Sequence, residues 1–344
     1  MIHKYKLCGY NVVLDVNSGG VHIVDDLTYD LLDEIQPPFE AACPESVLEK
    51  LSEKYDREEL TACYEEILEA HKAGILYSED DYEQYAEVAV ASPVKAMCLN
   101  IAHDCNLRCE YCFASTGDFG EGRKLMTLET GKKAIDFLLT HSANRENLEL
   151  DFFGGEPLMN IGVVKQIVEY ARSKDKEYNK HFRFTITTNG MLLNDEITDF
   201  INKEMSNVVL SIDGRKEVND RMRKRVDGSG CYDRIIPKYR DLVEKRGDGE
   251  YYVRGTYTKY NLDFAEDVFS LLEEGFDQIS VEPVVTDPSD PYALTEEDLP
   301  AIFDEYERLM QKILDYEKTG KKFNFFHKRT GTLDGKKKES VKTG

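Results

Sequence analysis

The chain has 344 residues, of which 41% are hydrophobic and 10% aromatic, so it can build sizeable folded cores. It carries 44 Lys and Arg against 66 Asp and Glu, and its net charge of −22 argues against nucleic acids and anionic membranes as partners. No stretch has the roughly 20 apolar residues that span a bilayer, and the first 15 residues lack the apolar core of a signal peptide. These features predict a cytoplasmic protein of two domains whose eight cysteines stay reduced.

Residues 1–85 have the pattern of a small α+β domain. Two strands are expected in YNVVLDV and GGVHIVD, joined by a hairpin turn at residues 17–20. Three helices are expected at 27–35, 44–55 and 57–74, and ILYSED (75–80) is a candidate short strand. An acidic stretch begins at Ser78 and leads into a linker predicted at 86–93.

Three of the eight cysteines lie close together, with the spacing C-x3-C-x2-C, at Cys105, Cys109 and Cys112. A zinc site would need a fourth ligand, and His103 is too close in sequence to complete a tetrahedron comfortably. A cubane iron–sulfur cluster normally takes four cysteines, so three would leave one iron open to a small molecule. The triplet therefore favours an iron–sulfur cluster, with zinc and plain buried cysteines as the alternatives. Cys98, in the strand before this loop, is expected to be a small core residue.

From residue 94 to residue 326, short apolar runs alternate with longer amphipathic runs. Six strands are predicted at 94–101, 149–154, 182–188, 207–213, 251–258 and 278–284, each followed by a loop or helix. This alternation predicts parallel strands with helical crossovers, in either an open sheet or a partial barrel. In both architectures the chemistry gathers at the carboxyl ends of the strands, where the cysteine loop also lies.

Unusual residues occur at the ends of the other strands as well. Paired glycines allow close approach of a ligand to the backbone, and two polar side chains pointing the same way suit the hydroxyls of a ribose. A lone arginine inside an apolar strand is expected to be a buried charge with a partner. Each residue alone also fits an ordinary turn or helix entry, so the inference rests on the whole set: Gly154, Gly155, Glu156, Asn189, Ser211, Asp213 and Arg254.

The cysteine loop, with the aromatic Tyr111 before its last cysteine, resembles that of the radical S-adenosylmethionine (SAM) enzymes. Residues 154–157 (GGEP) resemble their motif for the amino group of SAM, and Ser211 and Arg223 resemble the ribose and carboxylate contacts of the peptide-modifying branch. The resemblance implies an α/β fold with a partial (β/α)6 barrel over residues 94–326. It also implies a [4Fe-4S] cluster on the three cysteines, SAM as second cofactor, and an electron donor such as ferredoxin or flavodoxin. Reductive cleavage of SAM to a 5′-deoxyadenosyl radical is the implied chemistry.

Three longer segments resemble the maturases of "six cysteines in forty-five" (SCIFF) peptides: MIHKYKL with GYNVVLDVNSG, LNIAHDCNLRCEYCFA, and VRGTYTKYN. This resemblance implies hydrogen abstraction from a cysteine-rich precursor peptide and a thioether between a cysteine sulfur and an α-carbon. Residues 1–85 then resemble a winged-helix-like unit that captures the leader of the precursor as an added strand. A dimerisation or docking module is the alternative for these residues.

The sequence departs from that family at its C-terminal end. Its members continue into a cysteine-rich (SPASM) domain with auxiliary clusters, whereas no cysteine follows Cys231 here. Residues 327–344 are polar and lysine-rich and are expected to be disordered, so the chain is expected to stop before the auxiliary domain. Two other functions remain open: a sulfatase-maturase-like enzyme that oxidises a cysteine or serine in a protein, and a leader-binding protein without turnover.

Overall fold

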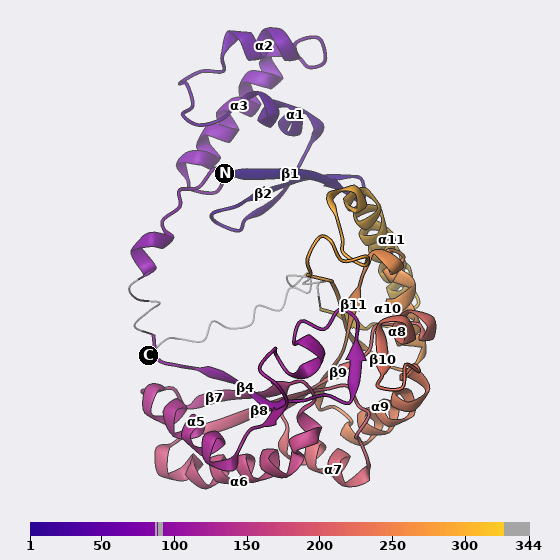
Figure 1. The fold of residues 1–344 in the computed structure, drawn as a ribbon. Coiled ribbons are helices and arrows are strands. Elements are labelled where there is room, and N and C mark those ends of the chain that lie inside the picture. Colours follow the sequence, from indigo (N-terminus) through magenta and orange to yellow (C-terminus); the bar gives the residue numbers. More distant parts are fainter. Residues whose placement is uncertain (87, 89–91, 327–344) are drawn as a thin grey trace. The chain divides into compact units, whose positions relative to one another are not determined.

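The computed structural model describes residues 1–86, 88 and 92–326, which form two compact units divided between Ser92 and Pro93 (Figure 1). Unit 1 precedes this division and unit 2 follows it. The lysine-rich tail expected at 327–344 lies outside the described residues, as does part of the linker expected at 86–93. None of the described helices combines the length and the apolar character needed to cross a membrane.

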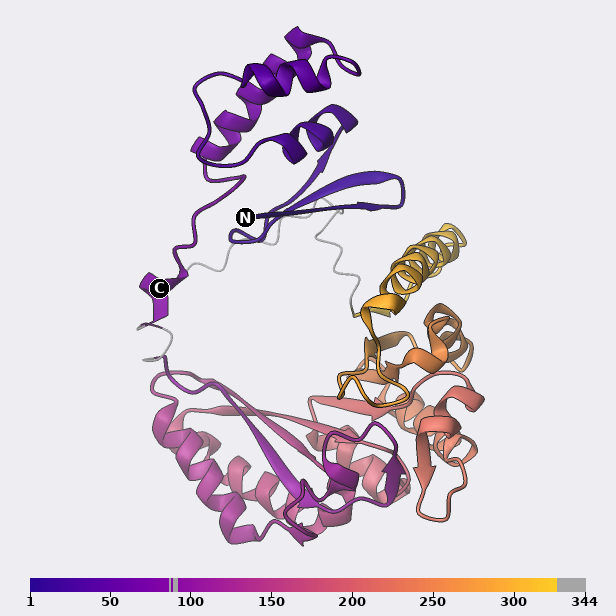
Figure 2. The same ribbon diagram turned by 45° about the horizontal axis from the view of Figure 1, so that its top comes forward.

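Unit 1 contains a three-stranded antiparallel sheet with three helices packed on one of its faces (Figure 2). The hairpin turn predicted at 17–20 joins the second and third strands, and the three predicted helices are present. The sequence reading missed the first strand, and the strand it proposed at 75–80 is wrong, because these residues run as turn and coil. The elements are β1 (Ile2–Leu7), β2 (Tyr10–Asp15), β3 (Val21–Val24), α1 (Asp26–Glu34), α2 (Glu45–Leu51), α3 (Arg57–Lys72) and the 3-10 turn η1 (Tyr82–Tyr85).

Asp15, at the end of β2, ties the hairpin turn to the segment that follows α3. Its carboxylate is fully buried and accepts hydrogen bonds from the backbone N–H groups of Ser18 (3.0 Å) and Ser78 (2.9 Å), and from the Ser78 hydroxyl. Burial alone would raise the pKa of Asp15, but the hydrogen bonds from Ser18 and Ser78 outweigh it and hold that pKa well below its usual range.

The depressed pKa makes the stability of this region depend on pH. We expect the Asp15 carboxylate to contribute fully above its unfolded-state pKa of about 4 and to lose that contribution as pH falls towards the lower folded-state value. Replacing Asp15 by Asn should destabilise unit 1 at pH 7 by roughly 1–3 kcal/mol, because an amide N–H then faces other donors. Hydrogen–deuterium exchange of the full chain measures this as faster exchange at residues 10–24. The difference between the variant and the parent chain should shrink towards pH 3, and a difference that stays constant over that range would contradict the assignment.

Unit 2 is built on a sheet of six parallel strands, as the alternation predicted. The strand order is β13-β12-β11-β9-β8-β7-β4-β6, in which β6 is antiparallel to β4 and β13 adds a short parallel strand. The strands are β4 (Ala96–His103), β6 (Lys124–Leu125), β7 (Asn147–Gly154), β8 (His181–Thr188), β9 (Asn207–Ser211), β11 (Glu250–Tyr257), β12 (Gln278–Pro283) and β13 (Asn324–Phe325). The fold is therefore the α/β partial barrel expected from the sequence.

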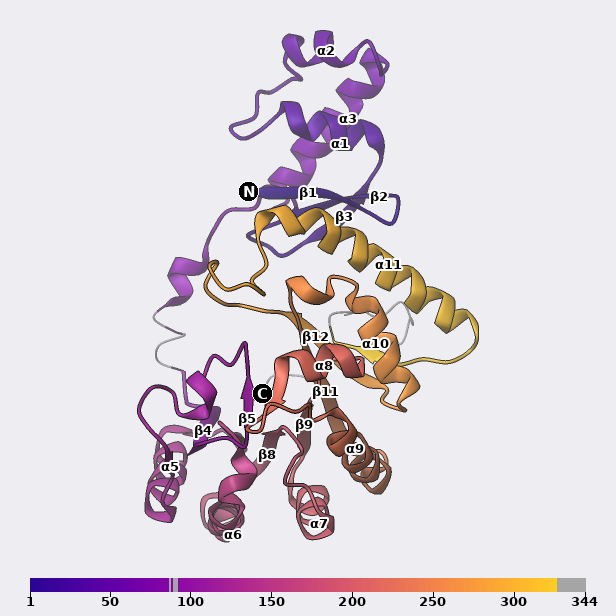
Figure 3. The ribbon, with the colours of Figure 1, turned by 45° about the vertical axis from the view of Figure 1, so that its right-hand side comes forward.

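Helices cover one face of this sheet, and strand alternation decides which side chains they bury (Figures 1 and 3). On β7, for example, Leu150 and Phe152 are fully buried against the helices. The helices are α5 (Leu128–His141), α6 (Ile161–Tyr178), α7 (Asp195–Glu204), α8 (Lys216–Met222), α9 (Tyr232–Arg246), α10 (Phe264–Glu273) and α11 (Leu299–Lys318). The 3-10 turns are η2 (Ser115–Gly117), η3 (Pro157–Asn160), η4 (Lys259–Asn261) and η5 (Glu296–Asp298).

The opposite face of the sheet, called the inner face below, carries exposed polar side chains. Cys98 on β4 is exposed and lies opposite Asp151 on β7, so the expectation that it is a core residue is wrong. Arg254 on β11 is also not a buried charge, because its side chain is 52% exposed and pairs with Glu282 on β12. Both errors arise because alternation identifies two faces of a strand but does not show which one the helices cover.

Candidate functional site

The three clustered cysteines lie on the loop that follows β4, and a two-stranded ribbon holds this loop in place. The ribbon consists of β5 (Leu107–Cys109) and β10 (Arg223–Arg225), which pair antiparallel so that Arg223 lies opposite Cys109. The Arg108 guanidinium fixes the turn by donating to the carbonyl oxygens of Cys105 (2.7 Å) and Leu107 (2.6 Å). The ribbon thus brings an arginine more than a hundred positions away in the sequence next to a cysteine of the loop.

The three cysteines of the loop are all half-buried. Burial raises the pKa of Cys105 to about 11 and that of Cys109 to about 12, and the Cys112 thiol adds to both shifts by charge repulsion. Within the described residues, no three His, Cys, Asp or Glu side chains are placed to share a single metal ion. In a cubane cluster each cysteine binds its own iron, so the ligands need not converge on one point. Three half-buried cysteines on one loop therefore fit a cluster better than a mononuclear zinc site.

A buried hydrogen-bonded trio lies against the cysteine loop. The Tyr111 hydroxyl donates to the Asp213 carboxylate (2.6 and 2.8 Å) and accepts from Nη1 of Arg223 (2.9 Å). Nη1 of Arg223 is also 3.7 Å from an Asp213 oxygen, and both side chains are at least 90% buried. Burial raises the pKa of Asp213 even though Arg223 and Tyr111 counteract this effect. Because its oxygens are already engaged, Asp213 fits a positioning role better than the ribose contact expected from the sequence.

One N–H group of the Arg223 guanidinium has no hydrogen-bond partner in the structure described. Its Nε is buried and has no hydrogen-bond partner among the described residues. A buried N–H without a partner costs about 1–3 kcal/mol, so such a donor points to a ligand atom that completes it. A carboxylate is the group that a guanidinium binds best, because two N–H groups can meet its two oxygens. The residues present therefore fit a carboxylate-bearing ligand next to the cysteine loop.

Glu156 does not have a free carboxylate. It is fully buried, and it accepts hydrogen bonds from the Thr188 hydroxyl (2.7 Å) and from the backbone N–H groups of Asn189 (2.8 Å) and Leu158 (3.0 Å). Burial nevertheless raises its pKa above the usual range. The side chain thus locks the end of β7 to the end of β8, and any ligand contact of this loop is left to its backbone.

Two glycines let the backbone of the cysteine loop meet the backbone of the loop after β7. A Cβ on Gly155 would lie 2.2 Å from the carbonyl oxygen of Asp104. A Cβ on Gly117 would lie 2.6 Å from Cβ of Cys105 and 3.2 Å from the Cα of Gly155, and Gly117 has a φ of +98°. Side chains at these positions would separate the two loops.

Asn189 and Ser211 complete the set of predicted residues. The Asn189 amide donates to the Asn106 side chain (2.8 Å) and lies 3.5 Å from Sγ of Cys105, so it touches the cysteine site. Ser211 is half-buried at the end of β9, in register with Arg254, on the inner face of the sheet. Arg254 itself pairs with Glu282, and Glu282 also accepts from the Ser280 hydroxyl (3.1 Å).

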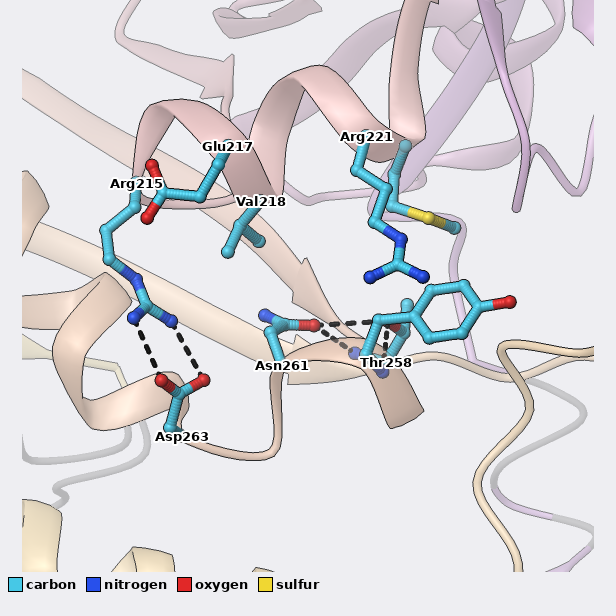
Figure 4. A pocket seen from close by; sticks show the side chains of 9 residues that line it. Arg215, Glu217, Val218, Arg221, Thr258, Asn261 and Asp263 are labelled. Carbon is cyan, nitrogen blue, oxygen red and sulfur yellow. Dashed lines mark hydrogen bonds and ion pairs between the residues drawn. The ribbon is translucent and has the colours of Figure 1, made fainter.

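A pocket of about 500 Å³ lies beside α8 and is separate from the cysteine loop, none of whose cysteines lines it (Figure 4). The Arg215 guanidinium donates two hydrogen bonds of 2.8 Å to the Asp263 carboxylate at one end. At the other end the Arg221 guanidinium stacks 3.5 Å above the ring of Tyr260. These contacts anchor the helix that leads directly into Arg223, so the pocket walls contribute to the placement of that residue.

Sequence reasoning did not find several residues that shape the site. Gly117 and Arg108 belong to the loop but match no motif, and the pairing of β5 with β10 involves only three residues on each side. Gly117 directly precedes Asp118, Phe119 and Gly120, and in the sequence it looks like one more loop residue. Only the close approach to Cys105 reveals its role.

The comparisons with known proteins agree with this geometry. Residues 95–236 match the family model described as a 4Fe-4S single cluster domain. The solved structure of native anSMEcpe with bound S-adenosylmethionine and the Kp18Cys peptide has the same fold, with a TM-score of 0.60 and 19% identity over 68% of this chain and 64% of that one. The three cysteines of the loop lie within the residues that match this model, so the match supports an iron–sulfur cluster on that loop.

Curated relatives match part of the chain. The cysteine-type anaerobic sulfatase-maturating enzyme of Clostridium novyi is 25% identical over 62% of this chain and 56% of its own length. The radical SAM cyclopropyl synthase TigE of Paramaledivibacter caminithermalis is 24% identical over 56% of this chain and 40% of its own length. An uncharacterised protein of Methanocaldococcus jannaschii is 36% identical over 39% of this chain and 44% of its own length. The chain thus spans about half the length of the curated relatives it matches.

Proposed function

We propose that this protein is a radical SAM peptide maturase that forms thioether cross-links in a cysteine-rich precursor peptide. Similarity to a radical SAM cyclopropyl synthase and to a sulfatase-maturating enzyme supports an enzyme, and both the structure of anSMEcpe with a bound peptide and the sulfatase-maturating relative support a peptide or protein substrate. The SCIFF-like segments of the sequence supply the thioether part of the proposal.

The proposal assigns the cofactor contacts to the residues described above. Cys105, Cys109 and Cys112 would each hold one iron of the cluster, which would leave one iron free for SAM. The guanidinium of Arg223 binds the carboxylate of SAM, and this contact is supported by its unpartnered buried Nε. The backbone of residues 154–156 would bind the amino group of SAM, and Ser211 would bind its ribose.

When bound, the two cofactors supply a 5′-deoxyadenosyl radical that takes a hydrogen atom from the substrate. The chain's own residues hold and orient the reactants. Tyr111 and Asp213 fix the Arg223 guanidinium through the hydrogen bonds that join the three side chains. A thioether forms when the α-carbon loses a hydrogen atom and the thiol loses a proton, and one electron leaves to an acceptor. We assign both electron delivery and electron removal to iron–sulfur or flavin carriers of the ferredoxin or flavodoxin class.

The open edge of β3 is the observation that supports a peptide substrate most directly. Among the described residues β3 pairs only with β2, and its side chains Val21 and Ile23 are 62% and 69% exposed. A groove of about 370 Å³ follows this edge, between β3 and α3. Its floor includes Val13, Leu32, Ile67 and Leu76. An extended leader segment added to β3 would satisfy the free backbone groups and bury apolar side chains in the groove.

A single reconstitution tests the enzymatic part of the proposal. The full chain is loaded anaerobically with iron and sulfide and mixed with SAM, dithionite and a synthetic cysteine-rich precursor peptide. We expect release of 5′-deoxyadenosine and a peptide that has lost two hydrogens for each cross-link while keeping its sulfur. Loss of sulfur from the peptide would instead indicate oxidation of a cysteine to an aldehyde, as in a sulfatase-maturase-like reaction. Peptide binding without 5′-deoxyadenosine would identify a leader-binding protein without turnover.

A further inference from the structure

The negative charge of this protein is concentrated in unit 1. Residues 1–92 contain 6 Lys and Arg against 21 Asp and Glu, which gives −15, whereas residues 93–344 contain 38 against 45, which gives −7. Four of the six cations of unit 1 already form ion pairs with acidic residues of the same unit: Lys4, Lys50, Lys54 and Arg57. Unit 1 therefore keeps a strong negative field that its own cations do not neutralise.

Two of the uncompensated carboxylates lie in the groove between β3 and α3. Glu66 lies on the stripe of α3 that lines the groove, one position before Ile67 and four before Ala70. Asp25 lines it from the end of β3, where its side chain also caps α1 through Thr28 (2.8 Å). Neither makes an ion pair within the part of the chain that the structure describes. The groove thus combines an apolar floor, an open strand edge and a negative rim.

The pKa of Cys63, which lines the groove, is affected by the same negative charges. Burial raises its pKa, and the negative charges of Asp25 and Glu66 raise it further, while a hydrogen bond with the Thr28 hydroxyl (3.3 Å) acts in the opposite direction. Both carboxylates are thus close enough to the groove floor to act on a group bound there.

We propose that the groove between β3 and α3 selects an extended peptide segment that alternates aliphatic residues with lysine or arginine. This inference rests on the proposed leader-binding role of unit 1 and adds the chemistry of the leader. Alternation is required because successive side chains of an added strand point to opposite sides, so that one set enters the apolar floor. The cationic side chains meet Glu66 and Asp25 at the rim, and a neutral or acidic segment forgoes this attraction or is repelled.

The selection is tested with three fluorescent nine-residue peptides, in which valine alternates with lysine, glutamine or glutamate, titrated against the full chain by anisotropy. We expect the lysine peptide to bind most tightly and to weaken as salt rises from 50 to 500 mM, because screening acts on exposed charges. Replacing Glu66 by Gln should weaken the lysine peptide about three- to tenfold, as expected for a charge contact at a groove rim. Glu65→Gln is the matched control, because it removes the same charge from α3 outside the groove lining.

Ala70→Phe separates failure of this inference from failure of the leader-binding role, because the larger ring fills the groove without changing charge. If all three peptides bind equally and Ala70→Phe abolishes binding, the groove binds leaders but the charge selection is wrong. If Glu65→Gln and Glu66→Gln weaken the lysine peptide equally, the attraction is not local to the groove and the inference is also wrong. If no peptide binds, or if Ala70→Phe leaves binding intact, the leader-binding role of unit 1 fails as well.

Discussion

Anaerobically reconstituted Cys109→Ala protein is expected to lose both the broad visible absorbance of an iron–sulfur cluster and the release of 5′-deoxyadenosine from SAM. Cys109 is the middle one of the three cysteines in the sequence and lies opposite Arg223 in the ribbon of β5 and β10. Its removal deprives one iron of its ligand and leaves the cluster with only two protein thiolates. Iron and sulfide content, the absorbance spectrum and chromatography of the SAM reaction measure the loss.

Cys98→Ala is the matched control for this experiment. It removes the same chemical group from the neighbouring strand β4, but from an exposed position on the inner face of the sheet. This variant should keep its iron, its spectrum and its cleavage of SAM. Retained SAM cleavage in the Cys109→Ala protein would show that the cluster is held elsewhere.

Asp213→Asn is expected to have the second largest effect, first on stability and then on SAM binding. The substitution keeps the volume of the side chain but leaves the buried Arg223 guanidinium without its carboxylate. Removing one partner of a buried ion pair costs about 3–5 kcal/mol, because the remaining charge is neither solvated nor compensated. Denaturant unfolding, followed by circular dichroism, measures this loss in the full chain.

A second variant separates stability from function. The double variant Asp213→Asn, Arg223→Met also removes the buried positive charge that has lost its partner. It should therefore recover much of the lost free energy of unfolding. SAM binding, measured by equilibrium dialysis, should stay lost, because the guanidinium that we assign to its carboxylate is gone. Asp263→Asn is the control for the single change, since the exposed Asp263 shares Arg215 with Asp267 and its loss should cost at most about 1 kcal/mol. Restored SAM binding in the double variant would refute the role given to Arg223.

The strands of the sheet in unit 2 could be predicted from the sequence. Each of these parallel strands is buried on the face that the helices cover, so it appears in the sequence as a run of apolar residues. Leu150 and Phe152 on β7 and Val208 and Leu210 on β9 are fully buried, and the strand predictions rested on such runs. The ribbon of β5 and β10 escaped prediction because three residues on each strand carry no periodicity, and its partners are far apart in the chain. The first strand of unit 1 escaped because Ile2 to Leu7 alternates with lysines, as expected at the edge of a sheet.

The sequence indicated which residues are candidates for the site, but not what each side chain does there. Spacing identified the three cysteines, since the C-x3-C-x2-C pattern carries its own chemical meaning. The roles of Glu156 and Asp213 depend on which atoms donate to them, and these donors, such as Thr188 and Tyr111, lie on other strands and loops. A single sequence does not contain these pairings, which only the folded chain creates.

The glycine contact between the cysteine loop and the loop after β7 has a mechanical consequence. Backbone pressed against backbone, at Gly117 and Gly155, leaves no side chains that yield by changing rotamer. The two loops must therefore shift as one body, so whatever sets the position of Cys105 also sets the position of the strand end beside it. Assembly of the iron–sulfur cluster would in this way fix the shape of the SAM-binding site before SAM binds. A protein without its cluster should therefore bind SAM weakly, even when every residue that contacts SAM directly is intact.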